Sequence, residues 1–239
     1  PIGTSSKVKE AIKSGLGQLS SYPNGLAYEL RKKLATKFKI EQENFIFGSG
    51  VDEVLEILFF TFLEENDDII FADPSFAEYA RYATMIGANP VGKDTKIILI
   101  CNPNNPTGTI VEKDEVESFL KKIPKDILVV FDEAYFEYAA QSNEYPNSMN
   151  YLEKYKNVMT LRTFSKAYGL AGLRIGFGVA DREIIEAMER VRLPFNTTSL
   201  SQLGAIAALD DDEHIQKSVA INEKGKEYLY KELSKLGFD

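Results

Sequence analysis

Two kinds of hydrophobic pattern alternate along the chain. Short runs of β-branched and aromatic residues are typical of buried strands, and between most of them apolar residues recur with helical spacing. In residues 26–38, for example, Leu26, Leu30, Leu34 and Phe38 share one helical face. The other helical patterns cover residues 54–62, 116–123, 182–190, 199–208 and 213–236. The strand-like runs are residues 45–47, 69–72, 97–101, 127–131, 158–161 and 175–179.

This alternation predicts an α/β fold, a three-layer sandwich in which helices cover both faces of a mostly parallel central sheet. One junction does not fit it. If Asn89-Pro90-Val91 ends a strand and Ile97 begins a parallel neighbour, only about five residues join them, whereas a parallel crossover needs a dozen or more. Either the segment at Asn89 is not a strand, or it forms a hairpin, or residues are absent from the chain here. We favour the last explanation.

The composition of the chain excludes or disfavours several classes of partner and binding site. The chain has 239 residues and a net charge of −8, which fits one large domain or one and a half and disfavours nucleic acid and anionic membranes as partners. One cysteine (Cys101) and one histidine (His214) exclude a disulfide framework and a Cys/His zinc site, and we expect no metal. The longest apolar runs are too short for a membrane helix, and nothing in the sequence suggests secretion. We therefore expect a soluble, cytoplasmic protein.

Four strand-like runs each lead directly into a polar cluster. The clusters are Asp73-Pro74-Ser75-Phe76, Asn102 to Gly108, Asp132-Glu133-Ala134-Tyr135, and Arg162 to Lys166. Each has an ordinary structural explanation when taken alone, such as turn formation for Asn-Pro-Thr-Gly. Ligands of open α/β sheets, however, bind beyond the carboxyl ends of the strands. Four such ends would bring an aromatic ring, an amide, a carboxylate, a phenol and a lysine into one crevice.

Pyridoxal 5'-phosphate catalysis needs such a set of groups. The cofactor requires a lysine amine for a Schiff base and a carboxylate on its pyridine nitrogen, so that the ring can withdraw electrons. Hydroxyls, an arginine and the N-terminus of a helix are suited to its phosphate.

The chain resembles the aminotransferases of PLP fold type I, and within them the histidinol-phosphate aminotransferase group. The resemblance is carried by Asn104-Asn105-Pro106-Thr107-Gly108, Phe131 to Tyr135, and Thr163 to Ala167 followed by Gly169 to Gly176. Pro1 to Ser5 and Tyr22-Pro23 also resemble that group. The similarity covers essentially the whole chain.

The resemblance implies roles for the matching residues. Lys166 would form the Schiff base and move the proton between substrate and cofactor, and Asp132 would pair with the pyridine nitrogen. Tyr135 and Asn105 would hydrogen-bond the ring oxygen, and Phe76 would stack on the ring. The phosphate would be held by Ser165, Thr163, Arg174, Gly50, Val51, Asp52 and, from a neighbouring subunit, Tyr22. Taken alone, Arg174 also fits a surface ion pair, and Tyr22 fits a packed loop aromatic equally well.

The resemblance further implies three parts and a homodimer. Residues 1–25 would form an N-terminal segment and dimer-contact arm, residues 26–209 the large PLP-binding domain, and residues 210–239 a helix leading to a truncated small domain. Relatives carry a longer segment before the strand at Ile97, and their small domain supplies an arginine for the substrate carboxylate.

The implied reaction is a ping-pong transamination between an amino acid and a 2-oxo acid, with histidinol phosphate and 2-oxoglutarate as the expected pair in histidine biosynthesis. Three alternatives remain open. The substrate is another amino acid, such as an aromatic one; or the chain is an amino-acid phosphate decarboxylase of the same fold; or it is a non-catalytic fragment or binding protein that retains the fold. A nucleotide-binding protein is disfavoured because neither G-x-G-x-x-G nor G-x-x-x-x-G-K-S/T occurs.

Overall fold

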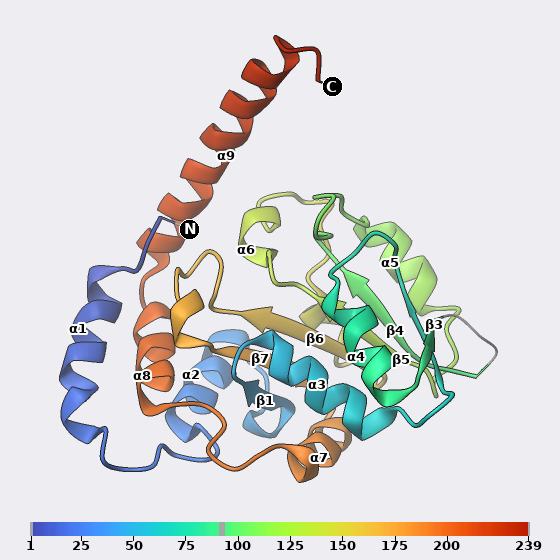
Figure 1. Ribbon diagram of the computed structural model, residues 1–239, viewed down its shortest axis with the longest axis horizontal. Helices are drawn as coiled ribbons and strands as arrows, with labels where there is room; N and C mark the ends of the chain where they lie inside the picture. Colours follow the sequence, from blue (N-terminus) through green and yellow to red (C-terminus); the bar gives the residue numbers. More distant parts are fainter. Residues whose placement is uncertain (1, 91–93, 239) are drawn as a thin grey trace.

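A mixed seven-stranded sheet runs through the computed structural model, which describes residues 2–90 and 94–238 (Figure 1). The strand order is β1-β7-β6-β5-β4-β2-β3. The strands are β1 (Phe45–Gly48), β2 (Asp68–Phe71), β3 (Asn89–Pro90), β4 (Thr95–Cys101), β5 (Leu128–Asp132), β6 (Val158–Thr163) and β7 (Gly176–Ala180). The six strand-like runs of the sequence therefore all form strands.

Only one strand of the described sheet runs against the others. The pairs β2–β3, β2–β4, β4–β5 and β5–β6 are parallel, whereas β7 is antiparallel to both of its neighbours, β1 and β6. The prediction of a mostly parallel sheet is confirmed. The reversal of β7 was not predicted, because a short apolar run shows that a segment is buried and does not show its direction.

Helices cover both faces of the sheet. The principal helices are α1 (Ser6–Gly15), α2 (Tyr28–Phe38), α3 (Val51–Phe62), α4 (Glu78–Ile86), α5 (Lys113–Leu120), α7 (Arg182–Val191) and α8 (Ser199–Ala208). A short helix, α6 (Phe136–Ala139), follows β5, and four 3₁₀ segments cover Leu16–Gln18, Gln42–Asn44, Ser148–Tyr151 and Ala171–Leu173. The layers are thus those of a three-layer sandwich.

The side chains of the strands divide between the two faces with a period of two. In β1, Ile46 packs into the core under α3, α4 and α7, whereas Phe45 and Phe47 pack into the core formed with α1, α2 and α8. Farther along the sheet, Val129 and Phe131 of β5 pack against α5. These strands are buried on both sides, which explains why their sequences are continuously apolar.

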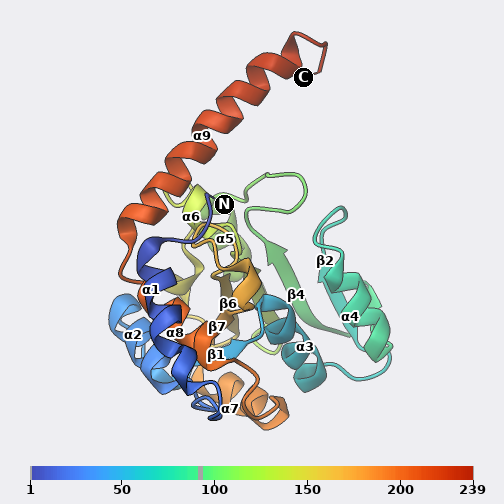
Figure 2. The same cartoon turned by 60° about the vertical axis from the view of Figure 1, so that its left-hand side comes forward.

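The last helix, α9 (Asp212–Ser234), leaves the body of the molecule (Figures 1 and 2). Its beginning lies near α6, where the Tyr138 and Ser218 hydroxyls are 3.4 Å apart. Farther along, Tyr228, Leu229 and Tyr230 are more than half exposed. No helix within residues 2–90 and 94–238 is long and apolar enough to cross a membrane.

The junction before β4 takes a form that the sequence did not predict. Strand β3 pairs in parallel with β2, on the side opposite β4, so that Asn89 and Thr95 both lie beside Asp68. The segment is therefore a short strand and does not form a hairpin with β4. The predicted interruption near residues 91–96 falls partly on residues 91–93, outside the described residues.

Candidate active site

A cavity of about 180 Å³ opens beyond the carboxyl ends of β5 and β6. It brings together ten of the twelve residues that the sequence singled out: Val51, Asp52, Phe76, Asn105, Asp132, Tyr135, Thr163, Ser165, Lys166 and Arg174. Cys101, Ala134 and Ala171 complete its lining. The rule that ligands bind beyond the carboxyl ends of parallel strands thus located the cavity correctly.

One part of the lining, which we call the buried wall, consists of Asp132 and Cys101. Asp132 ends β5, is 3% exposed, and accepts hydrogen bonds from the Tyr79 hydroxyl at 2.6 Å and the Ala134 backbone N–H at 3.0 Å. Burial raises the pKa of the Asp132 carboxyl above its usual value, and these two donors oppose the rise. Burial also raises the pKa of the Cys101 thiol, to about 11, so this thiol stays protonated at neutral pH.

Tyr79 is a residue that the sequence reasoning missed. It lies on α4 and is fully buried behind Asp132, a contact that depends on how α4 packs over the sheet. Its spacing from Phe76 was the available signal, because residues three apart face the same side of a helix.

Lys166 lies opposite a phenol ring. Its Nζ is 5.3 Å from the centre of the Tyr135 ring, and both side chains are partly exposed. Lys166 follows β6 after a turn in which the Thr163 hydroxyl accepts from the Ser165 N–H at 3.1 Å and donates to the Ser165 hydroxyl at 3.0 Å. This turn faces both hydroxyls and the amine toward the same cavity.

A second part of the lining, which we call the exposed wall, consists of Asp52 and Arg174. Their side chains are 42% and 45% exposed and form an ion pair at 2.8 Å. Arg174 also reaches the backbone oxygens of Ser49 and Ala171. The expected contact with a ligand and the simpler surface ion pair are therefore compatible, because Arg174 lines the cavity while it is paired.

Glycine is required where α3 meets this wall. Gly50 caps the twelve-residue helix with φ 85°, a conformation that favours glycine, and a Cβ there would collide with the Arg174 guanidinium. Gly50 does not line the cavity itself, whereas the next two residues do. The first turn of α3 therefore faces the cavity with the partial positive charge of a helix N-terminus.

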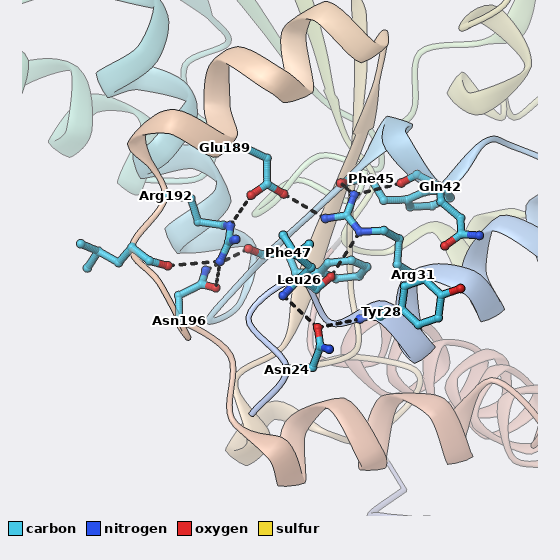
Figure 3. A network of polar contacts seen from close by, with 11 residues as sticks. Asn24, Leu26, Tyr28, Arg31, Gln42, Phe45, Phe47, Glu189, Arg192 and Asn196 are labelled. Carbon is cyan, nitrogen blue, oxygen red and sulfur yellow. Dashed lines mark hydrogen bonds and ion pairs between the residues drawn. The ribbon is translucent and has the colours of Figure 1, made fainter. Parts of the chain in front are cut away.

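A polar network connects α2 and α7 with the loop before α3, and Figure 3 shows its part from Arg31 to Asn196. The Glu189 carboxylate lies between the guanidiniums of Arg31 and Arg192 at 2.9 and 2.7 Å, and Arg192 donates to Asn196 at 2.9 Å. Asn196 in turn donates to Glu53, which accepts from the Ser49 N–H. The network thereby joins α2 and α7 to the loop before α3.

A buried ion pair braces the strand ends on the reverse side. Glu133 and Arg162 are 2% and 3% exposed and form two hydrogen bonds, at 2.9 and 2.7 Å. The Arg162 guanidinium also lies 3.4 Å from the centre of the Phe136 ring. Glu133 directly follows Asp132, and Arg162 directly precedes Thr163. Neighbouring residues of an extended segment point to opposite faces, so this pair does not line the cavity that Asp132 and Thr163 line.

A larger groove of about 830 Å³ adjoins the cavity and shares Asn105, Tyr135 and Lys166 with it. It runs between the loop of residues 103–110, the short helix α6, and Asn222, Glu223 and Lys226 of α9. A second molecule bound there would therefore lie within reach of the lysine.

Tyr22 is not brought to the cavity within this chain. Its side chain is 83% exposed and packs on Phe195, with ring centres 4.8 Å apart. The predicted contact with a neighbouring subunit stays a prediction.

The groups present fit pyridoxal 5'-phosphate. A buried carboxylate, an amine, an aromatic face and an amide line one cavity, together with two hydroxyls, a guanidinium and a helix N-terminus. The carboxylate matches the cofactor's pyridine nitrogen, and the last three kinds of group match a phosphate.

Comparisons with known proteins agree with this fit. The profile of the family "Aminotransferase class I and II" matches residues 2–93 and 88–239. A histidinol-phosphate aminotransferase of Caldicellulosiruptor saccharolyticus is 44% identical over 254 aligned residues, which cover 99% of this chain and 71% of the relative. The family match thus divides at the junction before β4, and the alignment is longer than the 239-residue chain. Both findings agree with the inference that relatives carry additional residues.

Two solved structures are similar as well. Histidinol-phosphate aminotransferase from Clostridium acetobutylicum has a TM-score of 0.88 and 25% identity, covering all of this chain and 75% of that one. The enzyme from Sinorhizobium meliloti, in complex with pyridoxal-5'-phosphate, has a TM-score of 0.85 and 25% identity, covering 91% of this chain. This chain spans 64% of the length of the Sinorhizobium protein. From the family match and the identity to curated relatives, the chain belongs to the class I and II aminotransferases, the pyridoxal 5'-phosphate-dependent transaminases.

Proposed function

We propose that this chain is the cofactor-binding part of a histidinol-phosphate aminotransferase, which exchanges an amino group between histidinol phosphate and 2-oxoglutarate in cytoplasmic histidine biosynthesis. The observation that carries the proposal is the convergence of Lys166, Asp132 and Arg174 on one cavity. The substrate is supported by relatives named histidinol-phosphate aminotransferase at 40–44% identity.

In this proposal each end of the cofactor has its own partners. Bound pyridoxal 5'-phosphate supplies an electron sink for the bonds at the substrate's α-carbon. Asp132 would accept a hydrogen bond from the pyridine N–H, Asn105 and Tyr135 would hydrogen-bond the ring oxygen, and Phe76 would pack on the ring. The phosphate would be bound by Thr163, Ser165, Arg174 and the N-terminus of α3, from its N-cap Gly50 to Asp52.

Lys166 has two proposed tasks. Its Nζ would hold the cofactor covalently, and the same amine would move the proton at the substrate's α-carbon. The adjoining groove lies on the Lys166 side of the cavity and offers room for the substrate side chain. The Lys166 Nζ lies over the Tyr135 ring, 5.3 Å from its centre, so this side chain already faces the cavity.

We further propose a homodimer in which Tyr22 contacts the cofactor phosphate of the partner subunit. The support is the exposed contact between Tyr22 and Phe195, together with the exposed leucines near them in sequence, Leu19, Leu26 and Leu193; each of the five is 46% or more exposed. Light scattering checks this proposal: Phe195→Asp should give monomers, whereas Tyr22→Phe should leave a dimer that binds the cofactor more weakly.

Borohydride reduction in the presence of pyridoxal 5'-phosphate, followed by peptide mapping, tests the reactive residue. The label should lie on Lys166 and be absent from Lys166→Ala, while Lys121→Ala, an exposed lysine of the same charge, should label normally. A label on any other residue would contradict the assignment.

A visible absorption spectrum tests the substrate. Histidinol phosphate should bleach the yellow colour of the bound cofactor, and 2-oxoglutarate should restore it. Bleaching by an aromatic amino acid alone would support a different aminotransferase, and release of CO₂ from an amino-acid phosphate would support a decarboxylase. A protein that stays colourless would support a non-catalytic fragment.

A further inference from the structure

We infer that Tyr79 is a positioning residue of the proposed reaction: its hydroxyl keeps the Asp132 carboxylate ionised and directs its free lone pairs toward the cofactor's pyridine nitrogen. The inference rests on the proposed function, because it assigns Tyr79 a task only when pyridoxal 5'-phosphate occupies the cavity. Tyr79 does not line the cavity and acts through Asp132.

Packing fixes the position of the hydroxyl. Tyr79 is 0% exposed, and its ring meets the Phe71 and Phe76 rings edge-on, with centres 5.9 and 5.5 Å apart. A buried aromatic held on two sides has little rotational freedom, so the hydroxyl stays 2.6 Å from Asp132 Oδ2. Phe76, one of these two neighbours, is also the ring expected to stack on the cofactor. Tyr79 therefore contacts two of the proposed partners of the pyridine ring.

Each of the two carboxylate oxygens of Asp132 accepts one of these hydrogen bonds. Tyr79 donates to Oδ2 and the Ala134 N–H donates to Oδ1, and a carboxylate has about four acceptor sites. Lone pairs thus remain for a pyridine N–H in the cavity that Asp132 lines. A carboxyl held on both oxygens is also unable to turn away from the ring.

The hydroxyl also affects the charge of Asp132. Burial raises the pKa of Asp132, and the bond from Tyr79 is the largest opposing effect. Burial and the neighbouring carboxylate raise the pKa of Tyr79 far above its usual value, so the phenol remains a donor. The other titratable groups around Asp132 are Asp52 of α3, Cys101 of β4, Glu133 beside it, Tyr145 after α6 and, across the cavity, Lys166.

Loss of the hydroxyl would change cofactor binding in a pH-dependent way. Without this donor, Asp132 would keep its proton up to a higher pH, and a protonated Asp132 no longer attracts the pyridinium charge. Affinity for the cofactor falls as pH drops through the pKa of Asp132 in the empty protein, so removal of the hydroxyl should move that fall to higher pH.

The test compares Tyr79→Phe with Tyr82→Phe, which removes a hydroxyl from another buried tyrosine of the same helix. The dissociation constant of pyridoxal 5'-phosphate is measured for each protein at a series of pH values. Since the cofactor's own titration is common to all of them, only differences between proteins count. For Tyr79→Phe we expect about tenfold weaker binding at neutral pH and a midpoint higher by about one pH unit, because a hydrogen bond to a charged group is lost.

Tyr82→Phe should match the unmodified protein in both quantities. An unchanged midpoint in Tyr79→Phe would overturn the inference, even if binding were weaker overall. The pH midpoint of the cofactor's visible band gives a second readout and should differ from the unmodified protein only in Tyr79→Phe.

A double-mutant comparison separates positioning from packing. In the presence of Asp132→Asn, adding Tyr79→Phe should cost little further affinity, because the charge on which the hydroxyl acts is already gone. Equal losses with and without Asp132→Asn would show a packing role and overturn the inference. If the unmodified protein binds no pyridoxal 5'-phosphate, or borohydride labels a residue other than Lys166, the proposed function itself fails, whatever the Tyr79 comparison shows.

Discussion

The buried and exposed walls of the cavity differ in how their charges are held. Asp132 on the buried wall is 3% exposed and has two hydrogen-bond donors from the protein, whereas Arg174 and Asp52 on the exposed wall are nearly half exposed and pair with each other. A buried charge interacts strongly with its neighbours and is costly to disturb, while a solvated pair contributes little to stability.

This difference indicates that the two walls have different roles in the proposed reaction. The buried wall offers one fixed acceptor to the proposed pyridine ring, and its geometry is set before anything binds. The exposed wall offers a cation whose present partner can be exchanged, so Arg174 can turn from Asp52 to an incoming phosphate at small cost. The buried wall should therefore govern reactivity, and the exposed wall should govern affinity.

Asp132→Asn should have the largest effect. The amide keeps the shape of the side chain but not the charge that faces the pyridine nitrogen, so amino-group transfer should fall by about a thousandfold, as when a preorganised electrostatic contact is lost. Single-turnover rates measured by the visible spectrum check this. A loss in cofactor affinity alone, with an unchanged rate, would place Asp132 outside the chemistry.

The same variant should have the opposite effect on the stability of the empty protein. The pKa of Asp132 is raised in the folded state, so its ionisation costs no stability below the unfolded pKa, and the cost grows as pH rises from the unfolded pKa to the raised folded one. Asp132→Asn removes this cost. Urea unfolding without cofactor should show that the stability of the variant relative to the unmodified protein increases as pH rises above about 4, the usual pKa of an aspartate.

Glu133→Gln should be the most destabilising of these changes. It leaves the Arg162 guanidinium buried without its charged partner, which costs about 3 kcal/mol in comparable pairs. Glu186→Gln is the control, because its pair with Arg182 is mostly exposed and should contribute little to stability. Equal unfolding midpoints for the two variants would contradict the contrast between buried and exposed pairs.

Arg174→Gln should weaken cofactor binding by about tenfold, since one charge-assisted bond to the phosphate is lost. The unfolding free energy should change by less than about 1 kcal/mol, because the pair with Asp52 is half exposed. Binding measured at low and high salt checks the assignment: the effect of the variant should shrink as salt increases.

Asp52→Asn should have the smallest effect. Removing the carboxylate frees Arg174 and takes a negative charge away from the proposed phosphate position, so binding should tighten by about two- to threefold. Weaker binding would mean that Asp52 itself contacts the ligand and that the exchange of partners is wrong.

Much of this arrangement could be predicted from the sequence. Asp132 directly follows an apolar run, and Thr163, Ser165 and Lys166 belong to the cluster after the strand-like run of residues 158–161. Such runs mark buried strands whose ends meet at one edge of a sheet. Their convergence on one cavity follows from local pattern and one topological rule, and the structure confirms that convergence.

The remainder depends on contacts that no local pattern encodes. Tyr79 is one aromatic residue among several in its segment, and only the packing of α4 over β5 makes it the partner of Asp132. The reversed direction of β7 likewise follows from how the chain returns after the loop that carries Arg174. The junction before β4 could be recognised as irregular but not resolved, because its short length conflicts with any ordinary parallel crossover.

The ion pair between Glu133 and Arg162 has a consequence for protein engineering. Because it clamps two adjacent strands one residue from the cavity, mutations that never touch a substrate can still spoil catalysis by letting those strands slide apart. Libraries designed to widen substrate range should therefore keep this buried ion pair and the shared residues Asn105, Tyr135 and Lys166, and instead diversify exposed groove positions such as Gln141, Asn222 and Lys226.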